Sequence, residues 1–335
     1  MRKKLQKAFT LVELIVVIAI IAILAAVSVV SYIAFVNEAN KSADQQAVTQ
    51  MNTILEANEK LDGKPETITQ VFGVLENNGI SAEDYHPLLS NRYFFWDSSV
   101  NRIVYSDDAY SVLYPSNLTS QTKASGWYTL SGEIKSDSAW QSAPTTVRDS
   151  NGNITAAAIG TPEQMFDVFT KLNKKEISLV STSVITLTED LDMMGTGQSF
   201  NLFSGTLDGG NHTISSLALT KSTQSHFNEA YGTNKAYVQG LIGQPTSDIV
   251  VKNLKIDNFQ LDVKANQVAA LIGNVVFKAT SPVVNSVSIQ NVDITNSTIK
   301  GGGKVGSFIG QVQGTGTVTI DANSTIRNST VTTTV

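Results

Sequence analysis

The most pronounced pattern along the chain is a long apolar run near its start. Leu14 to Val30 is a stretch of seventeen residues in which only Ser28 is polar. As an α-helix with a rise of 1.5 Å per residue, this run measures about 26 Å, close to the hydrocarbon thickness of a bilayer. Apolar residues at 11–12 and 32–36 lengthen it, so residues 11–36 are predicted to cross a membrane.

Beyond this run the pattern is that of the same helix continuing with one apolar face. Residues 37–48 are polar but contain no helix breaker, and apolar residues then recur at helical spacing up to Leu55. The segment Asp62-Gly63-Lys64-Pro65 ends the helix. We therefore predict one helix over residues 9–61, about 80 Å long. Its second half needs a globular domain to cover the apolar stripe.

Residues 62–142 are predicted to form a small αβ unit against this helix. A short helix is expected over residues 67–77. The aromatic or β-branched runs 93–96 and 102–105 are typical of a hairpin, and 126–130 is typical of a further strand. This unit contains three tryptophans, which we expect to cover the helix rather than to form a glycan-binding platform: Trp96, Trp127 and Trp140.

Residues 143–175 are predicted to be a linker followed by a short helix. The linker is rich in Ser, Asn, Asp and Thr. Thr161-Pro162-Glu163 then supplies a cap residue, a proline at the first helical position and an acid in the first turn.

Residues 176–335 change to short β-rich segments, so the chain as a whole is predicted to be α+β. A four-residue motif that ends in Ile-Gly recurs at 240–243, 270–273 and 307–310, at spacings of 30 and 37 residues. Each copy is followed by a strand that ends in Asn. Such repeats cannot bury a face alone and must stack. Asn at matching places suggests a ladder of side-chain hydrogen bonds at a repeated turn. The candidate repeat residues are Gly240, Gly243, Gly273, Gly310, Asn258, Asn291 and Asn328.

This region resembles the Gly-Leu-x-Gly repeat segments of bacterial surface proteins and adhesins. In those proteins, a phrase similar to Gly205-Thr206-Leu207-Asp208-Gly209 opens a parallel β-helix or a related solenoid. The resemblance implies a solenoid-like C-terminal domain, and a β-sandwich is the alternative.

The start of the chain admits three interpretations. A secretory signal peptide has the same basic start and apolar run and is cut after the run, here near Ala25-Ala26. A plain membrane anchor is the second interpretation, and a leader cut before the apolar run is the third. Glu13 favours the third, because a carboxylate in a membrane helix costs on the order of 2.5–3.5 kcal/mol on insertion scales. Neither a signal peptide nor an anchor has a use for that cost.

The segment Lys7-Ala8-Phe9-Thr10-Leu11-Val12-Glu13-Leu14 closely resembles the processing site of type IV prepilins. The resemblance implies that a prepilin peptidase on the cytoplasmic side cuts after Ala8 and methylates the new N-terminus at Phe9. The family usually has Gly where this chain has Ala8. Other pilin subunits are the implied partners, with the Phe9 amine of one subunit paired to Glu13 of its neighbour. Leaving either charge unpaired in an apolar core costs several kcal/mol, so the pair can set axial register.

The same resemblance implies an inner helix that lies first in the membrane and then in a filament core. Its candidate residues are Leu14, Ile18, Ile21 and Leu24. Arg2, Lys3, Lys4 and Lys7 precede this helix, so the N-terminus is predicted to stay inside the cell and the rest of the chain to lie outside. The expected location is the cytoplasmic membrane and then a surface filament.

Charge and composition narrow the remaining functions. The formal net charge is −5, and no basic cluster follows the leader, so no general affinity for nucleic acid is expected. The chain has no cysteine, which excludes disulfides, thiolate metal sites and a cysteine nucleophile, and removes the C-terminal disulfide loop that many pilins have.

No catalytic pattern is evident. His86, His212 and His226 sit in unrelated segments, and no phosphate loop or paired nucleophile and base is present. We expect no cofactor, no metal and no enzymatic activity. The sequence predicts a structural subunit of a type IV pilus or pilus-like filament. The alternative is a minor or tip pilin, or a pseudopilin, that acts as an adhesin for a surface or glycan ligand, or in secretion or DNA uptake.

Overall fold

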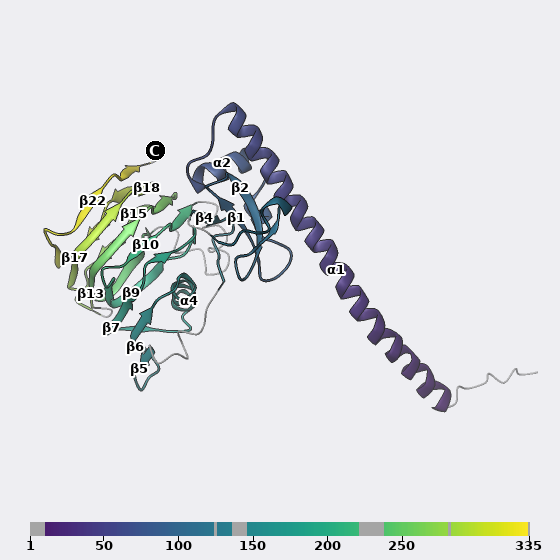
Figure 1. Ribbon diagram of the computed structural model, residues 1–335. Helices are drawn as coiled ribbons and strands as arrows, with labels where there is room; N and C mark the ends of the chain where they lie inside the picture. Colours follow the sequence, from purple (N-terminus) through teal and green to yellow (C-terminus); the bar gives the residue numbers. More distant parts are fainter. Residues whose placement is uncertain (1–10, 124–125, 136–145, 221–237, 281–282, 334–335) are drawn as a thin grey trace, which may run out of the picture.

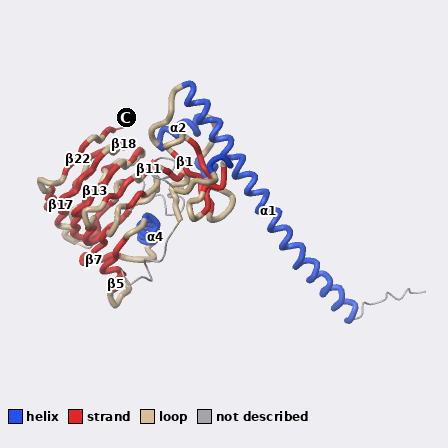
Figure 2. The backbone as a smooth tube through the Cα atoms, in the orientation of Figure 1, coloured by secondary structure: helices blue, strands red, loops and turns tan. Residues whose placement is uncertain are grey.

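The computed structural model describes residues 11–123, 126–135, 146–220, 238–280 and 283–333. Within these ranges the chain is α+β: a long N-terminal helix, a small αβ unit and a β-rich C-terminal region (Figures 1 and 2).

Helix α1 (Leu11–Leu61) is continuous over 51 residues. Its first half extends away from the rest of the chain, and its second half lies along the small unit (Figure 1). Val48, Met51 and Leu55 are buried there, at the helical spacing expected from the sequence. The predicted helix is therefore confirmed from Leu11 to its end.

The small unit places one helix and one antiparallel sheet against α1. The helix is α2 (Ile68–Asn77), and the short 3-10 turns are η1 (Ala82–Tyr85) and η2 (Ser116–Leu118). The strand order is β3-β2-β1-β4. The strands are β1 (Arg92–Asp97), β2 (Arg102–Asp107), β3 (Val112–Tyr114) and β4 (Trp127–Thr129).

The predicted hairpin of the small unit is confirmed as the antiparallel pair β1–β2. Trp96 and Trp127 are buried, at 0% and 1% exposure, so both belong to the core. Trp140 lies outside the described residues.

The C-terminal region contains one helix, α4 (Pro162–Asn173), and many short strands. These are β5 (Thr146–Arg148), β6 (Ile154–Ile159), β7 (Leu179–Leu187), β8 (Leu191–Asp192), β9 (Phe200–Asp208), β10 (Thr213–Ser215), β11 (Ala218–Thr220), β12 (Val238–Gln239), β13 (Ile242–Asp257), β14 (Gln260–Asp262), β15 (Gln267–Ala269), β16 (Ile272–Val276), β17 (Ser286–Thr295), β18 (Thr298–Gly301), β19 (Lys304–Gly306), β20 (Ile309–Gln313), β21 (Thr317–Ile320), β22 (Thr325–Arg327) and β23 (Thr330–Thr333).

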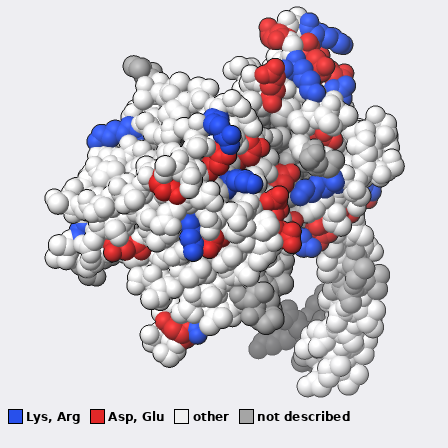
Figure 3. Space-filling view, turned by 60° about the vertical axis from the view of Figure 1, so that its left-hand side comes forward, with Lys and Arg blue, Asp and Glu red and all other residues white. Residues whose placement is uncertain are grey.

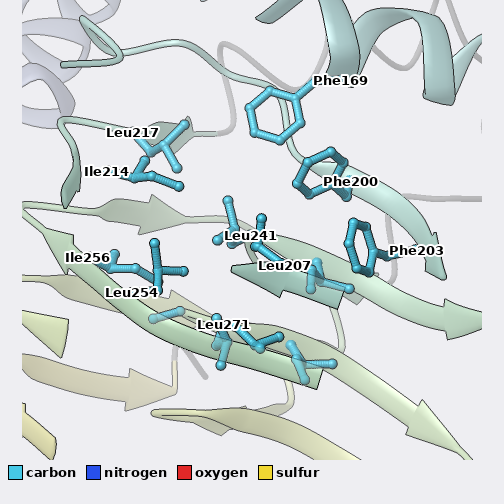
Figure 4. Close-up of a cluster of buried hydrophobic side chains, with 14 of the residues drawn as sticks. Phe169, Phe200, Phe203, Leu207, Ile214, Leu217, Leu241, Leu254, Ile256 and Leu271 are labelled. Atoms are coloured by element: carbon cyan, nitrogen blue, oxygen red, sulfur yellow. The ribbon is translucent and has the colours of Figure 1, made fainter. Parts of the chain in front are cut away.

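These strands form three sheets in which every described pair except β5–β6 is parallel. The main path of the large sheet is β20-β16-β13-β9-β7-β6-β5, and the smaller sheets are β11-β14-β18-β23 and β12-β15-β19. Apolar side chains from the sheets fill one shared interior (Figure 4). Phe169 of α4 lies beside Phe200 of β9, with ring centroids 4.6 Å apart. Helix α4 therefore packs against the same core.

The structure differs from the predicted linker at 143–175. Both β5 and β6 lie in this segment and continue the large sheet, since β6 pairs in parallel with β7. Ile154 and Ile159 are fully buried. The Ser, Asn and Thr content that suggested a linker occurs in the turn between the two strands and on their exposed faces.

Two columns of residues with positive φ mark the turns between stacked strands. The first column contains Asn211, Asn253 and Asn291, with φ of 69°, 51° and 52°. Asn291 Nδ2 donates to Asn211 Oδ1 at 3.3 Å and to Asn253 Oδ1 at 3.1 Å. Asn tolerates this left-handed conformation better than most residues, so the amides can line up along one corner.

The second column lies five residues further along the chain and corrects the predicted grouping of asparagines. It contains Ser216, Asn258, Asn296 and Asn328. Asn258 and Asn328 therefore share one column, but Asn291 belongs to the other. Asn occurs in both columns, so a strand that ends in Asn can align with either of them.

Two carboxylates link neighbouring strands of the large sheet by accepting backbone N–H groups. Asp248 Oδ1 accepts the N–H of Asn285 at 2.6 Å and that of Ser286 at 3.0 Å. Asp321 accepts the hydroxyl of Ser324 at 2.6 Å and the N–H of Asn291 at 3.0 Å. These hydrogen bonds hold the pKa of both carboxyl groups below the ordinary value, led by Asn285 for Asp248 and by Ser324 for Asp321.

The C-terminal region is expected to lose stability in acid because of these two groups. A carboxyl group with a lowered folded-state pKa stabilises the fold above its unfolded pKa, about 3.9. That contribution is lost as the pH falls through the folded-state pKa. The melting temperature, followed by circular dichroism from about pH 6 to pH 3, should fall less in a D248N/D321N double variant than in the original chain. An equal fall in both proteins would contradict this assignment.

Candidate assembly site on the N-terminal helix

The first half of α1 presents apolar side chains on all its sides. Consecutive residues from Leu14 to Ile18 are each at least 45% exposed. The predicted core residues Leu14, Ile18, Ile21 and Leu24 are 55–61% exposed, so the described chain does not cover them. Figure 3 shows this part of α1 almost free of charged side chains, which gather at its opposite end. A contiguous apolar surface of this size marks a site of contact with a membrane or with other proteins.

Glu13 interrupts this surface near its beginning. It is the acidic residue in the first turn of α1, where the helix dipole favours a negative charge. The next acidic residue along the helix is Glu38. Glu13 therefore lies at the edge of a long uncharged segment. Ala8 and Phe9, the predicted processing residues, lie outside the described residues.

The second half of α1 is fixed to the small unit by two buried polar side chains. Asp44 is 2% exposed and accepts the N–H groups of Leu88 at 2.8 Å and Leu89 at 3.4 Å. Asn52 faces β2, donating to the Ile103 carbonyl at 2.9 Å and accepting the Ile103 N–H at 2.7 Å. Because these bonds satisfy backbone groups of the unit, they fix the position of the helix on the sheet.

Burial around this contact also shifts the pKa of a tyrosine in β2. Burial, with the nearby Asp44 carboxylate, raises the pKa of Tyr105 to about 12. The tyrosine is therefore neutral throughout the physiological range.

The structure places the three copies of the repeated phrase on neighbouring strands. Ile242 aligns with Ile272, and Ile272 aligns with Ile309. Gly273 is buried in β16. The other three glycines lie against the backbone of a neighbouring segment. An added Cβ would come within 2.8 Å of the Ala269 carbonyl at Gly240, 2.6 Å of the Asn201 carbonyl at Gly243 and 2.6 Å of the Gly273 carbonyl at Gly310.

In the described part of the chain, the side chains that could take part in catalysis or metal binding lie far from one another. No group of three or more His, Asp or Glu side chains there is placed to hold a metal ion. His212 Nδ1 lies 3.4 Å from Asp190, whose side chain also accepts the Thr213 N–H. His226 lies outside the described residues.

Comparison with known families gives one match. The family model described as the prokaryotic N-terminal methylation motif matches residues 3–29. No curated protein and no solved structure was found to match the chain. In the part of the chain that the structure describes, no helix has both the length and the apolar character that a membrane span requires.

The matched segment contains Ala8, Phe9, Glu13 and the first part of the apolar surface of α1. It implies processing by a prepilin peptidase, association with the membrane and assembly with other pilins into a surface filament. The N-terminal motif therefore points to a type IV pilin-like or pseudopilin-like protein.

Proposed function

We propose that this chain is a structural subunit of a type IV pilus or a pilus-like surface filament. Cleavage after Ala8 and methylation of Phe9 release a helix that crosses the cytoplasmic membrane over residues 11–36 before assembly. The observation that carries the proposal is that the methylation motif overlaps the first half of α1, whose described side chains are apolar and exposed on all sides.

In the filament, the first half of α1 packs against the same segment of neighbouring subunits. Leu14, Ile18, Ile21 and Leu24 lose their exposure there, which is the main gain from assembly. The ammonium group of Phe9 pairs with Glu13 of an adjacent subunit. Because a buried unpaired charge is costly, this pair selects one axial register among the many that a uniform apolar surface allows.

The C-terminal region is then displayed outside the filament as a parallel β-solenoid. The pairing of β9 with β13, of β13 with β17 and of β17 with β21 supports this architecture, because all three pairs are parallel. A β-sandwich, the alternative, is built mainly from antiparallel pairs. The proposed role is structural rather than enzymatic, and the display position leaves the outer faces of the coils accessible.

The mass of the mature N-terminus tests the processing step. Filaments or membranes are purified, and the N-terminal peptide is sequenced and weighed. We expect a chain that begins at Phe9 and carries one additional methyl group. A mature chain that begins near residue 27 would indicate an ordinary signal peptide and would refute the proposal.

Antibody labelling of purified filaments distinguishes the subunit role from the tip role. Uniform decoration along the filament supports the major subunit. Decoration confined to one end would instead support a minor, tip-located pilin that acts as an adhesin.

A further inference from the structure

The sheets of the C-terminal region end in a set of strands that pair on one side only. We call this set, β19 to β23, the open edge. Strand β19 pairs with β15, β20 with β16, β21 and β22 with β17, and β23 with β18, and no described strand pairs with their other sides. In Figure 1 these strands lie along the outer margin of the sheets. A strand in this position presents a row of unpaired N–H and C=O groups that can template another strand.

The opposite margins of the two larger sheets are protected. The large sheet ends there in β5, a strand of three residues that forms an antiparallel hairpin with β6 and carries Arg148. A short edge strand with a charge is one of the usual ways in which proteins block pairing. The second sheet ends in β11, whose three residues are all buried, with Ala218 in the core of the small unit. The exposed edges of these sheets therefore gather at one end.

The open edge also leaves the interior of the sheets partly uncovered. Ile309 continues the column of Ile272, and Ile326 continues that of Ile294. Ile272 and Ile294 are 0% exposed, whereas Ile309 and Ile326 are only partly buried. Three other apolar columns end in the same way, at Val305, Val318 and Val331. An occupant of this edge must therefore present apolar side chains in these columns as well as a strand backbone.

Charge does not protect β20, β21 and β23. These three strands contain no charged residue and no proline. Val312 and Ile320 are 47% and 44% exposed. The charged residues of the open edge are Lys304 in β19 and Arg327 in β22, and Arg327 is paired with Asp293 of β17. Edges that stay unpaired usually carry lysine, proline or a bulge, so the open edge is suited to pair.

A second copy of the open edge has the properties that this occupant needs. It supplies unpaired strands and partly buried Ile and Val columns, and its β20, β21 and β23 bring no charge to repel their counterparts. Stacking the two interiors about a two-fold axis makes the paired strands antiparallel. Residues 304–333 form the surface, which matches the roughly 20–30 residues that each partner contributes to a standard interface. Its size is therefore sufficient for a stable dimer.

We propose that the open edge pairs with the open edge of a second copy of this chain. Two C-terminal regions then join end to end through antiparallel strands. This goes beyond the proposed role in a filament, because the contact uses strands of the C-terminal region and not the apolar first half of α1.

The absence of cysteine from the chain permits a direct test by cross-linking. Thr319 is exposed in β21, and Val147 is 51% exposed in β5, at the opposite margin of the large sheet. Full chains with Thr319→Cys or Val147→Cys are purified in detergent and treated with a short bismaleimide. We expect Thr319→Cys to form a cross-linked dimer and Val147→Cys to remain monomeric. If the main product from a mixture of the two proteins joins one variant to the other, the copies stack head to tail and the proposal is wrong.

Lysine substitutions on the open edge give the second test. Val312→Lys and Ile320→Lys each bring like charges together in the dimer. Each should raise the dimer dissociation constant, measured by sedimentation equilibrium, by about tenfold or more. Leu202→Lys is the matched control, because Leu202 is 45% exposed but lies in β9, inside the large sheet. It should leave the dissociation constant unchanged. Circular dichroism should show the same folded spectrum for all three variants, since each replaces an exposed side chain.

Three results would overturn the proposal. The first is a chain that stays monomeric at every concentration. The second is a dimer that the two edge variants do not weaken more than Leu202→Lys does, which would assign the contact to α1 or to another surface. The third is cross-linking at Val147 as strong as at Thr319. Neither the methylation of Phe9 nor the yield of filaments enters these measurements.

Discussion

Replacing Glu13 by alanine is expected to leave export and cleavage after Ala8 intact but to reduce filament yield by about two to three orders of magnitude. The carboxylate lies in the first turn of α1, beside an apolar surface with no other acidic residue before Glu38. Without it, the ammonium group of a neighbouring Phe9 has no partner in the packed core. Removing one member of a buried ion pair costs about 3–5 kcal/mol, and every 1.4 kcal/mol is tenfold in association.

The measurement is the amount of filament sheared from cells, compared with the total amount of mature subunit. Glu38→Ala is the matched control, since Glu38 is an exposed carboxylate on the same helix and its ion pair with Lys41, at 3.4 Å, is a surface contact. Such pairs contribute little, so Glu38→Ala should assemble normally. A normal yield from Glu13→Ala would remove the register role from this residue.

Replacing Gly205 by alanine is expected to destabilise the C-terminal region by more than about 3 kcal/mol. Losses this large come from a few mechanisms, of which overpacking in the interior is one. Gly205 lies in β9 with φ of +85°, and an added Cβ would lie 2.3 Å from the Ser183 carbonyl and 2.9 Å from that of Val180. Both carbonyls belong to β7, which pairs with β9 in the interior of the large sheet. The methyl group would have to push the two strands apart.

Gly152→Ala separates the two causes of this effect. Gly152 has a similar φ of +81°, but nothing lies within 4 Å of its added Cβ. Only the cost of a left-handed alanine remains there, about 1–2 kcal/mol. Urea unfolding followed by circular dichroism should therefore show a much larger loss for Gly205→Ala. Equal losses would mean that backbone conformation, and not the contact with β7, accounts for both.

The elements that the sequence predicted correctly are those whose determinants are local. Helix α2 begins at a Thr67 cap, and the Thr67 N–H donates to Gln70 Oε1 at 3.1 Å; the two residues are only three positions apart in the chain. The β1–β2 hairpin joins two short β-branched or aromatic runs across a tight turn. The long helix follows from apolar spacing alone.

The polar residues that fix α1 to the small unit could not be predicted in the same way. Asp44 and Asn52 sit in a segment whose pattern indicates an exposed helix face. Their partners, the backbone groups of Leu88 and Ile103, are 44 and 51 residues away. A side chain becomes buried or exposed according to what packs on it, and that depends on tertiary contacts.

The assignment of asparagines to one repeated turn failed for a related reason. Left-handed residues form two columns five positions apart, and Asn occurs in both. In the sequence, the strand that ends at Asn291 looks like the strand that ends at Asn258. In the structure, the register of β13 with β17 instead aligns Asn291 with Asn253. Only the pairing of distant strands distinguishes the two columns. The domain boundaries and the candidate cleavage site stay predictions.

The joint between α1 and the small unit also decides how the subunit carries mechanical load. In the filament proposed above, tension would enter each subunit through α1, and α1 is tied to β2 by the two Asn52–Ile103 bonds. Pulling the helix along its axis loads these bonds in shear, together with the buried contacts of Val48, Met51 and Leu55. The parallel sheets are attached to the other side of the small unit through Tyr128 and Thr129 (Figure 1). In that filament the pulling force would run along the helix, and the C-terminal sheets would lie to the side of its path.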